Sequence, residues 1–269
     1  GLAATGTTWV RERIATRDHT ERMLRARGVE VRTHEDPDGG WAVGLEGGQQ
    51  VRPVDEEVPG DLSAAAFWLV AASVHPDAEL ALTNVGLNPT RRAPLDLLAA
   101  MGAQIEERPI GPDSSRRARR HADDGVGEPA ADLVVRSAEL RPIDLGPDDV
   151  ARAIDEVPIL ALAASQARGT SRFRGAGELR HKESDRLAGI AEGLAALGVE
   201  VEVEGDDLAI HGAPGRLRGA EVSSNDDHRL AMTFAVAGLV GPEPVAIEGA
   251  AWASVSYPGF FAELERVRA

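Results

Sequence analysis

The amino-acid sequence predicts an α/β fold made of repeated units, with buried helices and outer sheets. Two segments, residues 58–106 and 154–204, share one order of features: an acidic residue, an alanine-rich helix, a β-branched strand, a polar turn with arginine, and an amphipathic helix that leads into a strand. A third copy begins at Asp227 and stops after its second helix. Units of this size cannot bury their apolar faces alone. We therefore expect neighbouring units to pack into a radial assembly.

The segment that begins at Arg17 supplies only the second half of such a unit. It contains one helix pattern that ends at Gly28, followed by two strand patterns on either side of residues 36–40. The chain is therefore expected to begin inside a repeat. The opening run GLAATGTT has no features of a signal segment, and we interpret the N-terminus as missing or processed.

Two kinds of helix are predicted inside the repeats. Residues 64–72 and 159–167 are apolar on nearly all sides, which is typical of helices buried at the centre of an assembly. A second kind is amphipathic, and its apolar residues recur at three- or four-residue spacing on one face. In the second repeat these expected core residues are Leu187, Ile190, Leu194 and Leu197.

Residues 111–130 show no periodicity and are rich in glycine, proline and charge, so we expect an exposed loop or flexible insertion. The run RRARR at residues 116–120 could bind polyanions. Because Asp123 and Asp124 follow it, a solvated charge run is the favoured interpretation, and we assign it no chemistry.

Composition excludes several classes of protein. The formal net charge of −15 argues against a nucleic-acid partner, because nonspecific phosphate binding depends on excess lysine and arginine. No apolar run reaches the roughly 18 residues of a membrane span, so no membrane partner is expected. The absence of cysteine excludes disulfides and thiolate chemistry, and a cytoplasmic location fits.

Lys182 is the only lysine in the chain, because every other basic side chain except histidine is arginine. Lysine carries a compact, point-like ammonium, whereas arginine carries a planar fork. A lysine retained among arginines indicates either chance or a site that needs an ammonium group, and we favour the second interpretation.

Three mixed-charge clusters lie where a loop meets a predicted helix N-terminus: residues 155–156, 182–186 and 227–229. Helix N-termini favour anions, and arginine beside them would bind carboxylate or phosphate. The alternative is that Lys182, Asp185 and Arg186 form only capping and ion-pair contacts. The threefold repetition, the single lysine and His228 favour one converging anion site.

A metal site is the competing chemistry, since Asp155, Glu183 and Asp227 could bind a hard cation. No segment has the spacing of an EF-hand loop or of a zinc motif such as HExxH. We therefore expect no metal.

Six strings carry a resemblance to a known family, in this order along the chain: TRDHTERML, VPGD with SAAAF, IDEVPILALAA, ELRHKESDR, DDHRLAM and SYPGF. The sequence resembles the C-terminal portion of the 5-enolpyruvylshikimate-3-phosphate synthase family of enolpyruvyl transferases. A relative, the UDP-N-acetylglucosamine enolpyruvyl transferase, shares the repeats but is not expected to contain KESDR, and it remains the alternative enzyme.

The resemblance implies an inside-out α/β barrel fold with two domains, each of three βαβαββ units, and an active site between them. Residues 1–58 would be the remainder of the N-terminal domain that binds shikimate 3-phosphate, and residues 59–269 would form the C-terminal domain. The missing N-terminal segment of the same enzyme would be a partner, and the family leads us to expect a monomer.

The resemblance also implies a reaction. The enolpyruvyl group of phosphoenolpyruvate would be transferred to the 5-hydroxyl of shikimate 3-phosphate with release of phosphate, and no cofactor would be required. This chemistry needs a base, an acid and cations for two phosphates and a carboxylate.

Roles follow from the resemblance position by position. Asp155 would accept the hydroxyl proton, Lys182 would stabilise developing charge, and Glu183 would protonate the methylene carbon. Substrates would be bound by Thr16, Arg17, Asp155, Lys182, Arg186, His228 and Arg229, with Thr16 and Arg17 at shikimate 3-phosphate.

Three positions depart from the family pattern: Glu178 replaces a usual asparagine, His181 replaces a usual valine, and the GAAWASV loop lacks a lysine that some relatives have. Phosphate binding would then depend more on the missing half. We expect the fragment alone to be inactive; the remaining alternative is a non-catalytic truncated homologue that serves as an interaction module.

Overall fold

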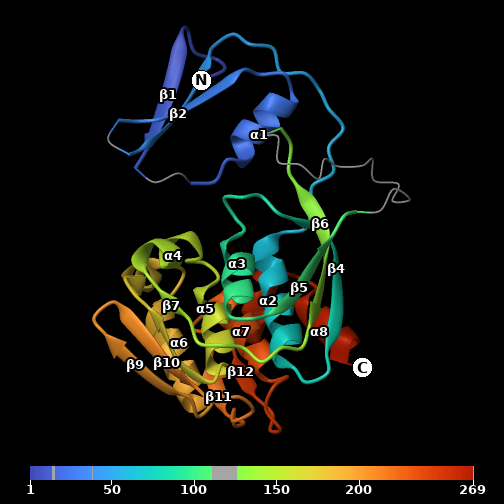
Figure 1. Ribbon diagram of the computed structural model, residues 1–269, viewed down its shortest axis with the longest axis vertical. Coiled ribbons are helices and arrows are strands. Elements are labelled where there is room, and N and C mark those ends of the chain that lie inside the picture. The colour runs from blue at the N-terminus through green and yellow to red at the C-terminus, as the bar shows by residue number, and fades with distance from the viewer. Residues whose placement is uncertain (14–15, 38, 111–125, 269) are drawn as a thin grey trace. The chain divides into compact units, whose positions relative to one another are not determined.

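The computed structural model describes residues 1–13, 16–37, 39–110 and 126–268, and the chain divides into two compact units (Figure 1). The first unit comprises Gly1–Asp61, Thr83–Arg92 and Glu107–Asp132, and the second comprises Leu62–Leu82, Ala93–Glu106 and Leu133–Ala269. The domain boundary predicted after residue 58 remains a prediction.

The N-terminal segment forms one antiparallel sheet of order β1-β3-β2 beside a short helix. The elements are β1 (Thr7–Glu12), α1 (His19–Ala26), β2 (Val31–Glu35) and β3 (Trp41–Glu46). Gly28 follows α1 with φ +82°, a conformation that costs glycine little, so the chain turns there into β2. The predicted half unit of one helix and two strands is therefore confirmed, with β1 in addition.

The first full repeat contains two helices and a three-stranded sheet of order β4-β6-β5. Its elements are α2 (Leu62–Val74), β4 (Glu79–Gly86), α3 (Ala93–Ala100), β5 (Gln104–Arg108) and β6 (Ala130–Arg136). The predicted order of helix, strand, helix and strand is confirmed.

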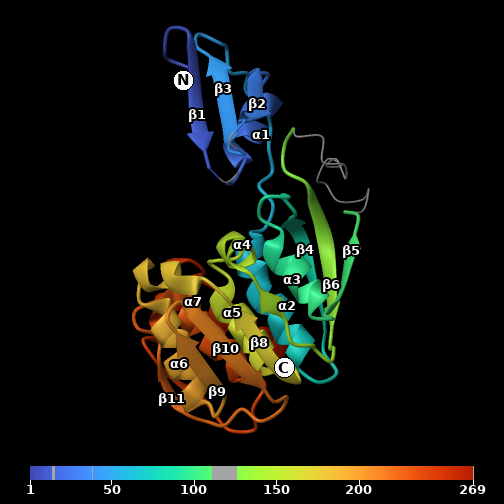
Figure 2. The same cartoon turned by 60° about the vertical axis from the view of Figure 1, so that its left-hand side comes forward.

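The second repeat lies within the second unit and has the same order from α5 onward, except that β7 and α4 precede it and a 3-10 helix is added after its first strand. Its elements are β7 (Asp144–Leu145), α4 (Pro147–Arg152), α5 (Val157–Ser165), β8 (Gly169–Phe173), the 3-10 helix η1 (Ala176–His181), α6 (Arg186–Ala196), β9 (Glu200–Glu204) and β10 (Asp207–Gly212). The sheet order is β7-β8-β10-β9, and Figure 2 shows β8, β9 and β10 side by side.

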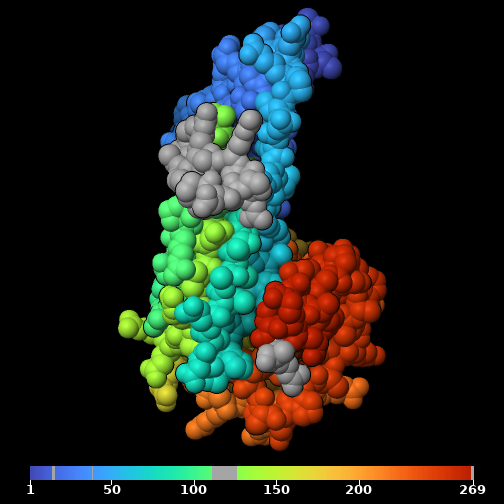
Figure 3. All heavy atoms as spheres, turned by 90° about the vertical axis from the view of Figure 1, so that its right-hand side faces the viewer, coloured from blue at the N-terminus to red at the C-terminus, as the bar shows by residue number. Residues whose placement is uncertain are grey.

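The third copy pairs β11 (Glu221–Ser223) with β12 (Ala246–Glu248) in parallel around α7 (His228–Ala237). It ends in the 3-10 helix η2 (Ala250–Val255) and α8 (Phe260–Arg268), as expected for a copy that stops after its second helix. This C-terminal part lies at the surface of the second unit (Figure 3), with Phe260 and Leu264 of α8 buried.

The core of the second unit is built from α2, α5 and α7, which contact one another. Every residue of α5 is buried, and so are most residues of α2, which confirms the prediction of central helices that are apolar on all sides. Small alanine side chains allow the close approach of these helices, and Phe67 contacts Phe260 edge to face at 6.1 Å between ring centroids. The four predicted core residues of α6, at positions 187, 190, 194 and 197, are also buried.

Residues 111–125, which contain RRARR and most of the predicted insertion, lie outside the described residues. The described helices include none with the length and apolar character that a membrane crossing requires.

Candidate functional site

The three mixed-charge clusters lie at helix N-termini of the second unit, as the sequence predicted. Glu156 is the N-cap residue of α5, Asp185 that of α6 and Asp227 that of α7. The Asp185 carboxylate accepts a hydrogen bond from the Ala188 backbone N–H at 2.9 Å, so part of the cluster does serve for capping.

Arg186 joins the three clusters. Its side chain is 0% exposed, and its three nitrogens each reach a different carboxylate. Nε donates to Asp227 at 2.7 Å, Nη1 to Asp155 at 3.4 Å and Nη2 to Glu183 at 2.5 Å. A buried charge needs such partners, because leaving it unpaired costs several kcal/mol. The convergence predicted for the clusters is therefore present within this unit.

Asp227 orients the second basic residue of the site. Its carboxylate is fully buried and accepts hydrogen bonds from the backbone N–H groups of Arg229 and Leu230, at 2.8 and 3.4 Å. The same carboxylate binds Arg186. One side chain thus fixes both the buried guanidinium and the start of the helix that carries His228 and Arg229.

Lys182 lies on the exposed side of this network. Its Nζ is 3.6 Å from Asp155 Oδ1 and 3.0 Å from Glu178 Oε1. The Asp155 carboxylate therefore lies close to two cations, Lys182 and Arg186, and both attract its negative charge. Glu178, one of the three departures from the family pattern, forms an ion pair with this ammonium.

Among the described residues, the Arg229 side chain is held through a single nitrogen. Nη1 donates to Ser63 Oγ at 2.8 Å and to the Asp155 carbonyl oxygen at 3.0 Å, and it lies 3.7 Å from Glu156 Oε1. The Ser63 hydroxyl in turn donates to that Glu156 oxygen.

His228 begins α7 beside these cations. Burial lowers the pKa of its imidazole below the ordinary value of 6.5, and the positive charge of Arg229 lowers it further. The side chain is therefore a neutral hydrogen-bonding group at neutral pH rather than a third cation.

Thr16 and Arg17 belong to the first unit, and their part in a common site remains a prediction. The Thr16 hydroxyl and backbone N–H both bind the Glu12 carboxylate, at 2.8 and 3.0 Å. Arg17 lines a cavity of about 310 Å³. Its other lining residues include Thr8, Glu12, Thr20, Glu21 and Leu24.

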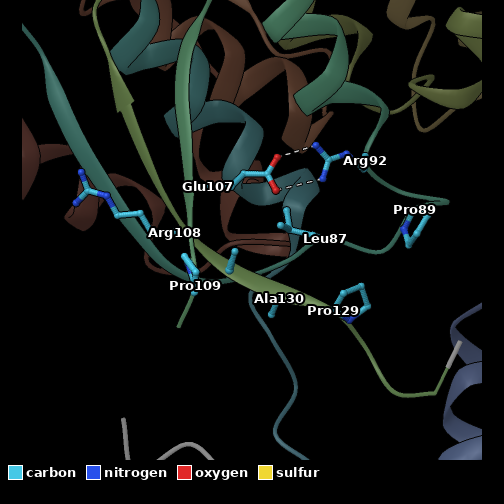
Figure 4. A pocket seen from close by; sticks show the side chains of 9 residues that line it. Leu87, Pro89, Arg92, Glu107, Arg108, Pro109, Pro129 and Ala130 are labelled. Carbon is cyan, nitrogen blue, oxygen red and sulfur yellow. Dashed lines mark hydrogen bonds and ion pairs between the residues drawn. The ribbon is translucent and has the colours of Figure 1, made fainter. Parts of the chain in front are cut away.

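A second cavity, of about 330 Å³, also lies in the first unit (Figure 4). Arg92 and Glu107 form a two-pronged ion pair in its wall, with distances of 2.7 and 3.4 Å. The charges of this pair cancel each other, and prolines and alanines form much of the remaining wall. The cavity therefore offers few groups that could bind an anionic substrate or transfer a proton.

Metal-ligating side chains gather at one place among the described residues, on the neighbouring strands β9 and β10. Glu200, Glu202 and His211 lie there with ligand atoms within 4.8 Å of one another. Asp155, Glu183 and Asp227, the set considered from the sequence, instead face the Arg186 guanidinium.

Sequence reasoning included Glu156 and Asp227 in the mixed-charge clusters without assigning either a substrate-binding or catalytic role, and it did not select Ser63. All three are buried polar residues at or beside the N-terminus of an otherwise apolar helix. That placement is a usable signal, because a buried polar group requires a hydrogen-bonding partner.

The family model described as EPSP synthase (3-phosphoshikimate 1-carboxyvinyltransferase) matches residues 1–264. The chain belongs to the EPSP synthase family. Among its relatives, a 3-phosphoshikimate 1-carboxyvinyltransferase of Gloeobacter violaceus is 47% identical over 268 residues, which are 100% of this chain and 58% of the relative. A protein of the same name from Bacillus cereus is 42% identical over 99% of this chain and 58% of its own length.

Solved structures agree with this family and confirm the predicted α/β fold class. The EPSP synthase of Acinetobacter baumannii matches with a TM-score of 0.88 and 37% identity, over 99% of this chain and 58% of that structure. The enolpyruvyl transferase NikO of Streptomyces tendae, at 21% identity and a TM-score of 0.71, shares the fold. The chain thus spans somewhat more than half the length of the relatives it matches.

Proposed function

We propose that this chain forms the C-terminal portion of a 3-phosphoshikimate 1-carboxyvinyltransferase. The reaction joins the 5-hydroxyl oxygen of shikimate 3-phosphate to carbon 2 of phosphoenolpyruvate and then eliminates phosphate. The observation that carries the proposal is the convergence of Lys182 and Arg186 on Asp155, in a member of a family whose reaction needs a base between cations.

Asp155 is the proposed base. Its Oδ1 lies within 3.6 Å of Lys182 and of Arg186, so the pair of cations balances the carboxylate before the reaction. As Asp155 takes the proton of the 5-hydroxyl, Lys182 stabilises the negative charge that develops on the attacking oxygen.

Glu183 is the proposed acid, and its present partner is Arg186 at 2.5 Å. An ionised carboxylate held by a guanidinium is a poor proton donor. The phosphoenolpyruvate carboxylate can exchange with Glu183 on Arg186, because both are anions of the same shape. Glu183, whose side chain is 52% exposed, is then released, takes up a proton from solvent and donates it to the methylene carbon.

Addition yields a tetrahedral intermediate with a methyl group and a phosphate on carbon 2. The Glu183 carboxylate, left ionised by the addition, then takes up a methyl proton, and phosphate leaves with the proton that Asp155 accepted, so the double bond is restored in the enolpyruvyl product. Arg229, with neutral His228 beside it, binds the leaving phosphate or the carboxylate. Thr16 and Arg17 bind the shikimate 3-phosphate from the first unit.

The test is phosphate release from phosphoenolpyruvate and shikimate 3-phosphate. The 269-residue chain is assayed alone and with the remaining N-terminal part of the Gloeobacter violaceus relative. We expect release only in the complemented sample, and its loss in Asp155→Asn but not in the exposed control Asp148→Asn.

Other outcomes have definite meanings. Release by the chain alone contradicts the need for a second half, and release only with UDP-N-acetylglucosamine as acceptor identifies the alternative enzyme. The absence of phosphate release with both acceptors favours a non-catalytic homologue.

We also propose that the protein is a monomer and is located in the cytoplasm. Sedimentation tests the oligomeric state, and cell fractionation tests the location.

A further inference from the structure

The hydroxyl of Ser63 bridges a buried carboxylate and Arg229. Ser63 lies in the first turn of α2 and is 2% exposed, while Glu156 at the N-cap of α5 is 1% exposed. Ser63 Oγ is 2.8 Å from Arg229 Nη1 on one side and is hydrogen-bonded to Glu156 Oε1 on the other. Three separate helices, α2, α5 and α7, thus meet at one hydroxyl group.

The chemistry of the three groups fixes the direction of each hydrogen bond. A guanidinium has donors only, so Ser63 must accept from Arg229 through an oxygen lone pair. The Ser63 O–H is then directed to the carboxylate of Glu156, which accepts. Because Glu156 holds this proton in place, the lone pair stays turned toward Arg229.

Both hydrogens of Arg229 Nη1 are used by acceptors, since the Asp155 carbonyl oxygen takes the second at 3.0 Å. Nε and Nη2 donate to no side chain or carbonyl of the described residues. These two nitrogens form the edge of the guanidinium that binds carboxylate or phosphate through two parallel bonds. The Arg229 side chain is 16% exposed, so the edge is not sealed in the core.

We propose that Ser63 and Glu156 are positioning residues that hold Arg229 by Nη1 and thereby present its Nε and Nη2 edge to an oxyanion. In the function proposed above, on which this inference rests, the oxyanion belongs to phosphoenolpyruvate. The helices that carry the three residues form the buried core of the unit, so the orientation of Arg229 is set by core packing rather than by an exposed loop.

Binding of phosphoenolpyruvate to the 269-residue chain, measured by titration calorimetry, is the first readout. Ser63→Ala removes the acceptor for Nη1, and we expect the dissociation constant to rise about tenfold, as for loss of a hydrogen bond to a charged group. Ser73→Ala is the matched control, because Ser73 lies on the same helix, is equally buried, and its hydroxyl has no partner among the described residues. It should leave the constant unchanged.

A double-mutant cycle tests whether Ser63 acts through Arg229. In an Arg229→Met background, Ser63→Ala should change the dissociation constant less than about twofold. An undiminished tenfold effect in that background overturns the proposal, because Ser63 would then act on the ligand or on the fold by another route.

Glu156→Gln distinguishes a positioning role of Glu156 from a purely electrostatic effect of its negative charge on anion binding. Removing a negative charge near the site should tighten anion binding if charge alone matters. The positioning role predicts weaker binding, because a neutral amide oxygen holds the Ser63 O–H less strongly than a carboxylate does, and the hydroxyl is then freer to rotate away from Arg229. Tighter binding in Glu156→Gln removes Glu156 from the proposal.

The side-chain nitrogen NMR signals of Arg229 give a readout that needs no ligand. Held by two acceptors, Nη1 should show slow rotation and resolved hydrogens, identified by their loss in Arg229→Met. Ser63→Ala and Glu156→Gln should collapse these signals, and Ser73→Ala should not. Unchanged signals in Ser63→Ala overturn the inference, whereas the expected NMR changes without any binding of phosphoenolpyruvate contradict the proposed ligand instead.

Discussion

Arg186 and Arg229 begin neighbouring helices of one unit, yet their surroundings differ in kind. Arg186 is sealed from solvent and gives each nitrogen to a carboxylate. Arg229 gives one nitrogen to a hydroxyl and a carbonyl oxygen, and its carboxylate neighbour lies at 3.7 Å. A saturated arginine can receive an anion only by exchange, whereas an arginine held by neutral acceptors keeps a binding edge.

Because their surroundings differ, we infer different roles for Arg186 and Arg229. Arg186 cross-links three helix N-termini and holds Glu183 until a competing carboxylate arrives. Arg229 is oriented in advance and needs no partner to leave. Electrostatic catalysis favours the second arrangement, because a preorganised charge requires little rearrangement during the reaction.

The largest expected effect is on stability and comes from Arg186→Met. This change leaves Asp227 buried and without its cation, which costs about 3–5 kcal/mol of the free energy of unfolding. Arg186→Lys should not restore it, because one ammonium cannot reach three carboxylates. Urea unfolding followed by circular dichroism is the measurement, and a loss below about 1 kcal/mol would show that the comparison overstates the role of Arg186.

Arg229→Met should lower the free energy of unfolding less than Arg186→Met does, and its main effect should be weaker ligand binding. We expect a loss of about 1–2 kcal/mol, since one nitrogen and two neutral acceptors are involved. The dissociation constant of phosphoenolpyruvate, measured by calorimetry, should rise about 100-fold. Equal destabilisation by the two arginine substitutions would erase the distinction between them.

His228, which begins the same helix that carries Arg229, makes the stability of this helix start depend on pH. Its pKa is lowered in the folded chain, so below pH 6.5 the unfolded chain takes up the proton first and stability falls until the folded pKa is reached. Above pH 6.5 both states are neutral and the residue contributes no pH dependence. His228→Gln should therefore lose less stability than the parent between pH 7.5 and pH 5.5, as measured by unfolding at each pH. A larger loss in the variant contradicts the direction of the shift.

Glu178→Gln should have the smallest effect on stability. The Glu178 side chain is 65% exposed, so its ion pair with Lys182 contributes about 0.5 kcal/mol or less. Without the Glu178 charge, Lys182 keeps its ion pair with Asp155, and we expect an anionic substrate to bind slightly more tightly. Thermal unfolding and calorimetry check both effects, and weaker binding would indicate that Glu178 itself contacts the ligand.

The repeated order of elements, the buried central helices and the helix end at Gly28 were predictable from the sequence alone. These features depend on local patterns, namely apolar spacing and the conformational freedom of glycine. The sequence also predicted that the three mixed-charge clusters, one of which contains Lys182, stand at helix N-termini. The family could be inferred from short strings for the same reason, since their order along the chain is a local property.

The sequence did not predict which cation is buried or which carboxylate it contacts. Arg186 and Arg229 have similar sequence neighbours, yet Asp227 lies 41 positions from Arg186 and Ser63 lies 166 positions from Arg229. The packing of α2 against α5 and α7 brings Ser63 and Glu156 to Arg229. Burial and partner choice depend on how distant helices pack, and no spacing along the chain encodes that directly.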